Sequence, residues 1–135
     1  MLCYADRAMV FRSPPERPVV LVVDDDPDIR GILGMLLSRE GYEVVTAIDG
    51  AAALEHVGDE RVALVVLDLQ MPRLDGDQFR RVYQERGGHA PILLVTASEV
   101  GPNDLARLGV SAYIAKPFDV ETMLETVDRL VNSHE

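Results

Sequence analysis

Residues 19–28 place a purely apolar run directly before a block of acids: they read Val19-Val20-Leu21-Val22-Val23-Asp24-Asp25-Asp26-Pro27-Asp28. A continuous run of β-branched residues and leucine is typical of a strand buried on both faces. Pro27 suits the first turn of a helix, and Asp26 suits the residue that caps it. Four carboxylates within five positions cost free energy through mutual repulsion unless a positive group is held among them. The stretch therefore predicts a buried strand, an acidic turn and a helix.

The alternation of apolar strands and amphipathic helices continues along the chain. The strand pattern predicts strands over residues 19–23, 42–47, 62–67, 91–95 and 111–115. Helical spacing of apolar residues predicts helices that begin at Pro27, at Asp49-Gly50 (with Leu54 and Val57), before Phe79, around Asp104 and at Val120. Strands that alternate with helices and are apolar throughout predict an α/β fold, a doubly wound five-stranded parallel sheet with helices on both faces.

Composition limits the function and the domain organisation. The chain has 135 residues, with 13 Lys+Arg against 23 Asp+Glu and a net charge of −10. This imbalance argues against direct nucleic acid binding by the domain and against binding to an anionic membrane. One cysteine, Cys3, allows no internal disulfide, and no apolar run could span a bilayer, so we expect a cytoplasmic protein. Residues 1–17 are predicted to form a flexible N-terminal extension, and residues 18–133 a single domain.

Polar residues follow four of the five predicted strands. Asp24 and Asp25 end the first strand, Asp68 the third, Thr96 the fourth and Lys116 the fifth. The carboxyl ends of parallel strands meet at one edge, where open α/β sheets bind their ligands. Carboxylates crowded together repel and raise one another's pKa, and a bound divalent cation removes that penalty. An acidic set of oxygen ligands predicts a Mg²⁺ site.

Four segments together resemble the receiver domain of bacterial two-component response regulators, the CheY-like family: VVLVVDDDPDIR, VVLDLQMPRLDG, LLVTAS and SAYIAKPF. The resemblance extends over residues 19–131 and implies a flavodoxin-like (βα)5 fold. It implies a phosphoacceptor that takes a phosphoryl group from a sensor histidine kinase or a phosphotransfer protein and then changes conformation. It also implies an unspecified downstream protein as the second partner. Such a protein catalyses its own Mg²⁺-dependent phosphorylation and dephosphorylation and is not otherwise an enzyme.

The resemblance also implies how the acids bind phosphate and metal. Asp68 matches the phosphoacceptor. Asp25 matches a direct Mg²⁺ ligand, and Asp24 matches the acid that orients metal-bound water. Gln70 matches the residue that binds the metal through its backbone carbonyl, and Asp68 itself completes the expected ligand set.

Three further residues match the groups that respond to the phosphoryl group. Thr96 matches the hydroxyl that contacts it, and Lys116 the amine that pairs with it. Tyr113 matches the aromatic switch residue whose position is coupled to Thr96. The implied reaction is consistent with general chemistry, because a carboxylate can attack phosphorus and phosphoryl transfer depends mainly on positioning and charge neutralisation.

Two alternative functions remain open. The chain could be a degenerate receiver, a protein-interaction module that works without phosphorylation. The presence of Asp25, Asp68, Thr96 and Lys116 argues against this. It could also be a metal-dependent phosphatase of the haloacid dehalogenase type, but such enzymes carry a second acid two residues after the nucleophile, where this chain has Gln70.

Two segments depart from the family pattern. Ser111 and Ala112 stand where many DNA-binding members have paired acids that form salt bridges between subunits. This difference disfavours that mode of dimerisation. The segment 98–109 is short, and Gly101-Pro102 interrupts the start of the fourth predicted helix, so we expect this helix to be irregular.

Overall fold

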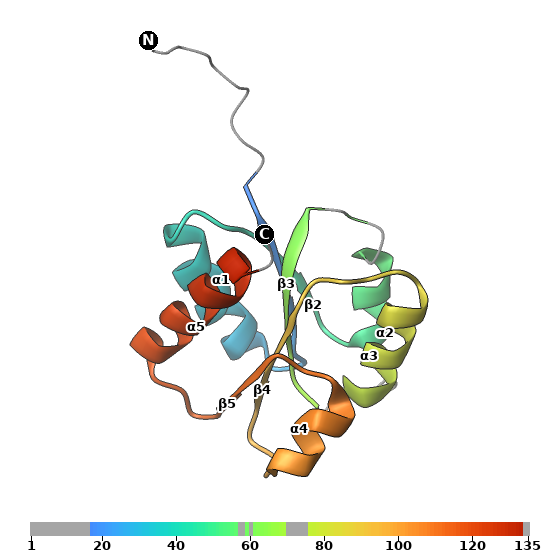
Figure 1. Ribbon diagram of the computed structural model, residues 1–135. Helices are drawn as coiled ribbons and strands as arrows, with labels where there is room; N and C mark the ends of the chain where they lie inside the picture. The colour runs from blue at the N-terminus through green and yellow to red at the C-terminus, as the bar shows by residue number, and fades with distance from the viewer. Residues whose placement is uncertain (1–16, 57–58, 60, 70–75, 134–135) are drawn as a thin grey trace.

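The computed structural model describes residues 17–56, 59, 61–69 and 76–133. These residues contain one sheet of five parallel strands in the order β2-β1-β3-β4-β5 (Figure 1). The strands are β1 (Val19–Val23), β2 (Glu43–Ala47), β3 (Val62–Leu67), β4 (Ile92–Thr96) and β5 (Ala112–Ala115). The predicted five-stranded parallel sheet is confirmed.

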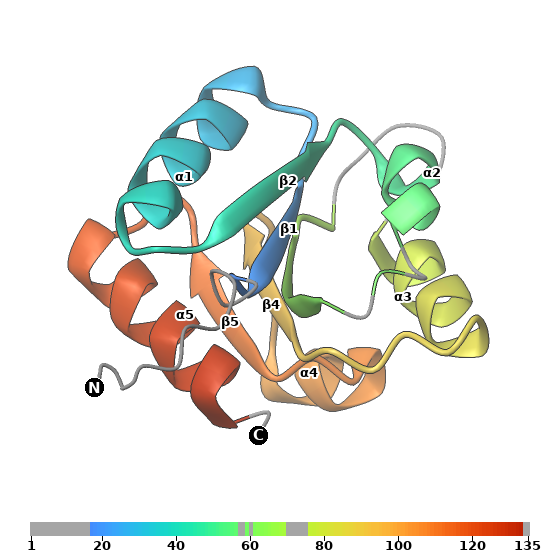
Figure 2. The ribbon, with the colours of Figure 1, turned by 90° about the horizontal axis from the view of Figure 1, so that it is seen from above.

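Helices cover both faces of the sheet. They are α1 (Pro27–Arg39), α2 (Gly50–Ala53) with a 3-10 turn η1 (Leu54–His56), α3 (Gly76–Glu85), α4 (Pro102–Leu108) and α5 (Val120–Ser133). Figures 1 and 2 show α1 and α5 on one face, with α2, α3 and α4 on the other. The predicted doubly wound architecture is therefore confirmed. Of the second predicted helix, Val57 lies outside the described residues.

The apolar run that opens the domain is buried from both sides. Every residue of β1 is at most 1% exposed. Val20 and Val22 pack in the core beneath α1 and α5, whereas Leu21 and Val23 pack in the core beneath α2 and α3. Side chains of a strand alternate between its two faces, so a strand covered on both faces has to be apolar at every position. This burial explains why the sequence shows no polar alternation here.

The helix starts that depend on a local cap lie where the sequence predicts them. The Asp26 carboxylate accepts a hydrogen bond from the Asp28 N–H at 2.9 Å, and the Asp49 carboxylate accepts one from the Ala52 N–H at 2.8 Å. Gly41 follows the end of α1 with a positive φ of 97°, a conformation that suits glycine. The two carboxylate caps define the first residues of α1 and α2, and Gly41 allows the chain to turn after α1.

The prediction of an irregular fourth helix is wrong. Gly101 is the N-cap of α4 and Pro102 lies in its first turn. The Gly101 N–H donates to Asp104 Oδ2 at 3.0 Å, and the helix ends at Gly109, whose φ is 68°. Proline fits a helix start because its missing N–H would have no partner there. The Gly-Pro pair therefore starts this helix instead of interrupting it.

Tyr42 differs from its predicted place in the second strand. It lies just before β2, is 8% exposed, and donates its hydroxyl proton to the Asp128 carboxylate on α5. This hydrogen bond connects the segment just before the edge strand β2 to the last helix.

Candidate functional site

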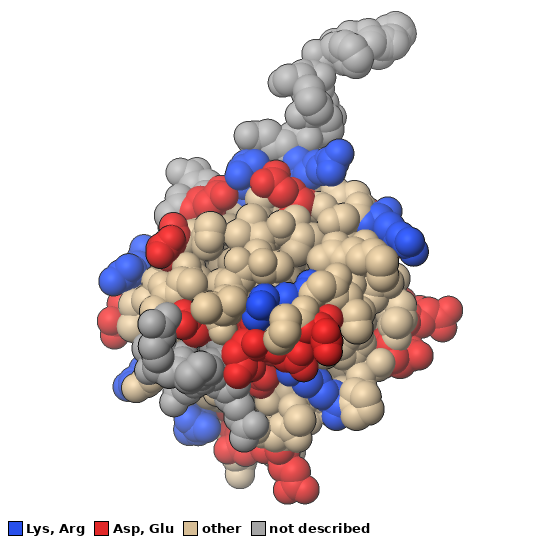
Figure 3. All heavy atoms as spheres, turned by 180° about the vertical axis from the view of Figure 1, so that it is seen from behind, with Lys and Arg blue, Asp and Glu red and all other residues tan. Residues whose placement is uncertain are grey.

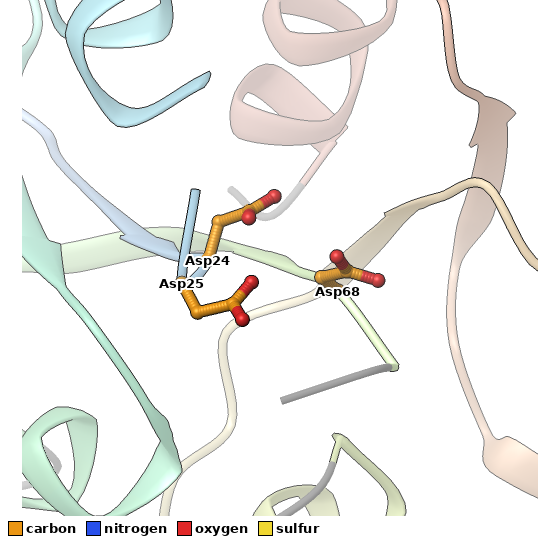
Figure 4. Close-up of side chains that lie close together, drawn as sticks. All are labelled: Asp24, Asp25 and Asp68. Atoms are coloured by element: carbon orange, nitrogen blue, oxygen red, sulfur yellow. The ribbon is translucent and has the colours of Figure 1, made fainter. Parts of the chain in front are cut away.

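Three carboxylates meet at the carboxyl edge of the sheet. Backbone pairing continues one residue past the strands, since the Asp24 N–H donates to the Ala47 carbonyl and the Asp68 N–H donates to the Val23 carbonyl, both at 3.1 Å. One oxygen from each of Asp24, Asp25 and Asp68 lies within 4.8 Å of the others. Figure 4 shows the three side chains together, two from the turn after β1 and one from the end of β3. The predicted convergence of these acids is confirmed.

The three acids differ in their exposure to solvent. Asp24 is 3% exposed and Asp68 6%, whereas Asp25 is exposed. An all-oxygen set with one ligand open to solvent fits Mg²⁺, which binds few carboxylates and keeps several waters. Gln70, the predicted backbone ligand, lies outside the described residues, as do residues 71–75.

Lys116 joins two of these acids. Its Nζ lies 2.7 Å from Asp24 Oδ2 and 3.0 Å from Asp68 Oδ2, and its side chain is 16% exposed. The Lys116 N–H donates to the Thr96 carbonyl at 3.0 Å, which extends the β4–β5 ladder to the same edge. The ionised set of three carboxylates and one ammonium carries a net charge of −2. The site therefore keeps an excess of negative charge for a cation.

Burial and hydrogen bonding act in opposite directions on the two partners. Burial raises the pKa of Asp24, while hydrogen bonds from Lys116 and from the Asp26 N–H lower it by less. Burial lowers the pKa of Lys116, but its bonds to Asp24 and Asp68 outweigh that effect and the pKa is raised. Repulsion by Asp68 contributes least to the raised pKa of Asp24. The predicted direction is thus right for Asp24, but its main cause is burial and not the crowding of charges.

Thr96 and Tyr113 are both linked to Ser98. Thr96 is fully buried at the end of β4, and its Oγ1 accepts a hydrogen bond from the Ser98 N–H at 3.3 Å. Tyr113 on β5 is half-buried and donates its hydroxyl proton to the Ser98 carbonyl at 3.4 Å. The two residues predicted to act as a switch therefore share one neighbour, while their switching role stays a prediction.

Sequence reasoning missed one residue at this edge. Arg30 on α1 donates from Nη1 to the backbone carbonyl oxygen of Asp24 at 2.8 Å. Asp24 Oδ1 also accepts a hydrogen bond from the Asp26 N–H at 2.9 Å. The only sequence signal is an arginine in the first turns of a helix that follows an acidic turn, and this signal does not reveal which group the arginine contacts.

The charged residues are mixed on the face that Figure 3 shows. Acidic side chains gather near the middle of the view, with basic ones beside them and around its rim.

None of the described helices has the length and apolar composition that a membrane span requires.

Known proteins with related sequences are response regulators. Residues 20–128 match the sequence profile of the response regulator receiver domain. Response regulator MprA of Mycobacterium ulcerans is 40% identical over 114 residues, which are 83% of this chain and 49% of that protein. Transcriptional regulatory protein GlrR of Escherichia coli is 37% identical over 111 residues, 81% of this chain and 25% of that protein. The chain thus spans about half the length of one relative and a quarter of the other.

Solved structures show the same fold. Chemotaxis protein CheY4 of Vibrio cholerae superimposes with a TM-score of 0.77 at 33% identity, over 84% of this chain and 98% of that one. Response regulator TrrA of Thermotoga maritima, solved in complex with Mg²⁺ and BeF, has a TM-score of 0.73 at 35% identity, over 83% and 97% of the two chains. Each similarity covers more than four fifths of this chain. The chain belongs to the response regulator receiver domain family.

Proposed function

We propose that this chain is a phosphoacceptor whose Asp68 receives a phosphoryl group in a Mg²⁺-dependent reaction. The observation that carries the proposal is the position of Lys116, whose amine lies 3.0 Å from Asp68 and 2.7 Å from Asp24. A carboxylate at a strand end with an ammonium beside it has both the nucleophile and a compensating charge. Membership of the family supports the same conclusion.

Each residue at the edge has a defined part in this proposal. An Asp68 oxygen attacks phosphorus, so that one O–P bond forms while the bond from phosphorus to the donor breaks. Lys116 stays close enough to pair with a phosphoryl oxygen, and the Thr96 hydroxyl is a donor that can turn toward another. Asp24, Asp25 and Asp68 would hold Mg²⁺, which when bound supplies further positive charge beside the phosphoryl oxygens. Attack of water on the mixed anhydride then releases inorganic phosphate and restores the free carboxylate.

The proposed partners follow from this chemistry. The donor is a phosphohistidine of a sensor kinase or of a phosphotransfer protein, and a downstream protein reads the phosphorylated state. Thr96 and Tyr113 both form hydrogen bonds with the backbone of Ser98. Movement of the Thr96 hydroxyl toward the phosphoryl group would break its bond to Ser98 and so disturb the hydrogen bond between Ser98 and Tyr113. The degenerate alternative is not favoured, because the acids, the amine and the hydroxyl are all in place at one edge.

Intact-protein mass spectrometry after incubation with acetyl phosphate and Mg²⁺ tests the proposal. The wild type should gain one phosphoryl group, and Asp68→Asn should gain none. Asp59→Asn, which removes an acid that pairs with Arg61 instead, should behave as the wild type. Beryllofluoride with Mg²⁺ should also shift the amide resonances around Tyr113.

Each contrary result has a distinct meaning. An unmodified wild type that shows no response to beryllofluoride would support the degenerate receiver. An undiminished adduct in Asp68→Asn would show that another residue is the acceptor. Steady release of phosphate without any adduct would favour the phosphatase.

A further inference from the structure

Every polar group of Asp24, in its backbone and in its side chain, takes part in a hydrogen bond. Its N–H donates to the Ala47 carbonyl at 3.1 Å. Its Oδ1 accepts from the Asp26 N–H at 2.9 Å, and its Oδ2 accepts from Lys116 Nζ at 2.7 Å. The remaining group, the backbone carbonyl, accepts from Arg30 Nη1 at 2.8 Å. Among the residues that the structure describes, Arg30 on α1 is therefore the side chain that donates a hydrogen bond to the Asp24 carbonyl.

The hydrogen bond to the Asp24 carbonyl affects the orientation of the next residue, Asp25. The Asp24 carbonyl and the Asp25 N–H belong to one planar peptide unit. A hydrogen bond that fixes this carbonyl also fixes the plane, and with it the direction in which the Asp25 side chain leaves the turn. Asp25 is exposed, and among the described residues no side chain hydrogen-bonds to its carboxylate. The placement of this carboxylate beside Asp24 and Asp68 thus depends on the backbone.

Two effects of Arg30 on a bound cation oppose each other. Its guanidinium is always charged, so its electrostatic effect on a nearby Mg²⁺ is repulsive. Its hydrogen bond to the turn is favourable, because a ligand that is already in position costs less to order when the cation binds. The sign of the change in Mg²⁺ affinity on removal of Arg30 shows which effect is larger.

We propose that Arg30 is a positioning residue of the cation site and strengthens Mg²⁺ binding by orienting the Asp24–Asp25 peptide, despite its positive charge. This inference rests on the Mg²⁺ site of the proposed function. Under this inference α1 contributes to the cation site through Arg30, which orients a ligand but does not itself bind the cation.

Calorimetric titration of the metal-free protein with MgCl₂ tests the inference. Arg30→Met keeps most of the aliphatic stem and removes the donors, and it should weaken Mg²⁺ binding about 10-fold, as loss of an outer-shell partner commonly does. Arg39→Met is the matched control, because it removes the same charge from the exposed end of the same helix. Its affinity should equal or slightly exceed that of the wild type. Should Arg30→Met not fold, Arg30→Lys replaces it, with a weaker affinity again expected.

A second readout follows the turn without metal. The Asp25 amide resonance of the metal-free protein should shift in Arg30→Met and stay in place in Arg39→Met, since that N–H shares the peptide whose carbonyl loses its donor. Equal or tighter Mg²⁺ binding by Arg30→Met would overturn the positioning role alone. Absence of Mg²⁺ binding by the wild type would overturn the metal site and this inference with it.

Discussion

Replacing Asp25 by asparagine should abolish the stabilisation of the fold by Mg²⁺ and slightly stabilise the metal-free protein. Asp25→Asn keeps the shape of the side chain and removes one negative charge. The charge matters in both states for opposite reasons. Without metal it repels the neighbouring acids, whereas with metal it is a ligand.

The repulsion can be estimated from the site. Asp24 and Asp68 together share the ammonium of Lys116, so Asp25 faces a net charge of −1. The nearest oxygens of the three acids lie within 4.8 Å. Two unit charges at this separation repel by about 1 kcal/mol in a water-like dielectric, which suits the exposed Asp25. Metal-free Asp25→Asn should therefore gain at most about 1 kcal/mol, and less at high salt.

The effect of the metal is larger. A ligand present at about 100 times its dissociation constant stabilises the folded state by about 2.7 kcal/mol if the unfolded chain does not bind it. For a domain of this size that corresponds to a rise of about 10 °C in melting temperature. The wild type should show this rise and Asp25→Asn should lose most of it.

Thermal unfolding followed by circular dichroism, in EDTA and in excess Mg²⁺ at constant ionic strength, measures both quantities. Asp26→Asn is the matched control, since it removes the neighbouring charge while asparagine still caps α1. It should keep the full Mg²⁺ increment. If Asp25→Asn gains as much from Mg²⁺ as the wild type and Asp26→Asn, Asp25 is not a ligand.

Two further predictions concern stability away from the site. Tyr42→Phe should lower the free energy of unfolding by about 1.5–2 kcal/mol, because the hydroxyl donates to the Asp128 carboxylate. Burial and Asp128 raise the pKa of Tyr42 above 10.0 in the fold, so its contribution is complete below that pH and declines above it. Denaturant unfolding over a pH series should show a shallower alkaline decline in Tyr42→Phe, and equal slopes would contradict this. Gly88→Ala should lower the free energy of unfolding by about 1–3 kcal/mol, because the added Cβ would clash with the Tyr83 ring. Gly34→Ala, whose Cβ meets nothing within 4 Å, should instead stabilise α1 by about 1 kcal/mol, and a loss in both variants would show that the close contact is not the cause.

Much of the fold could be predicted because its signals are local. The continuous apolar runs at β1 and β4 indicate strands that are buried on both faces, and in the structure every residue of β4 is at most 3% exposed. The caps Asp26 and Asp49 act within three residues of themselves. The start of α4 was mispredicted because Gly-Pro pairs are common in turns, and only the chain path shows that Pro102 occupies a first turn.

The acidic edge could also be predicted, since parallel strands bring their carboxyl ends together whatever the details of the packing. Its pairings could not. Lys116 meets Asp68 across 48 residues and Asp24 across 92, and these contacts depend on the register of three strands and on the side-chain packing between them. The contact of Arg30 with the Asp24 carbonyl spans six residues, yet it requires the turn between them to adopt one backbone shape. The spacing of apolar residues along the sequence determines which face of each helix or strand is buried, because side chains point to the same face at a constant interval in each kind of element. Which polar atoms meet is decided only when all the elements pack, because a hydrogen bond requires a match within a few tenths of an ångström that no single segment specifies.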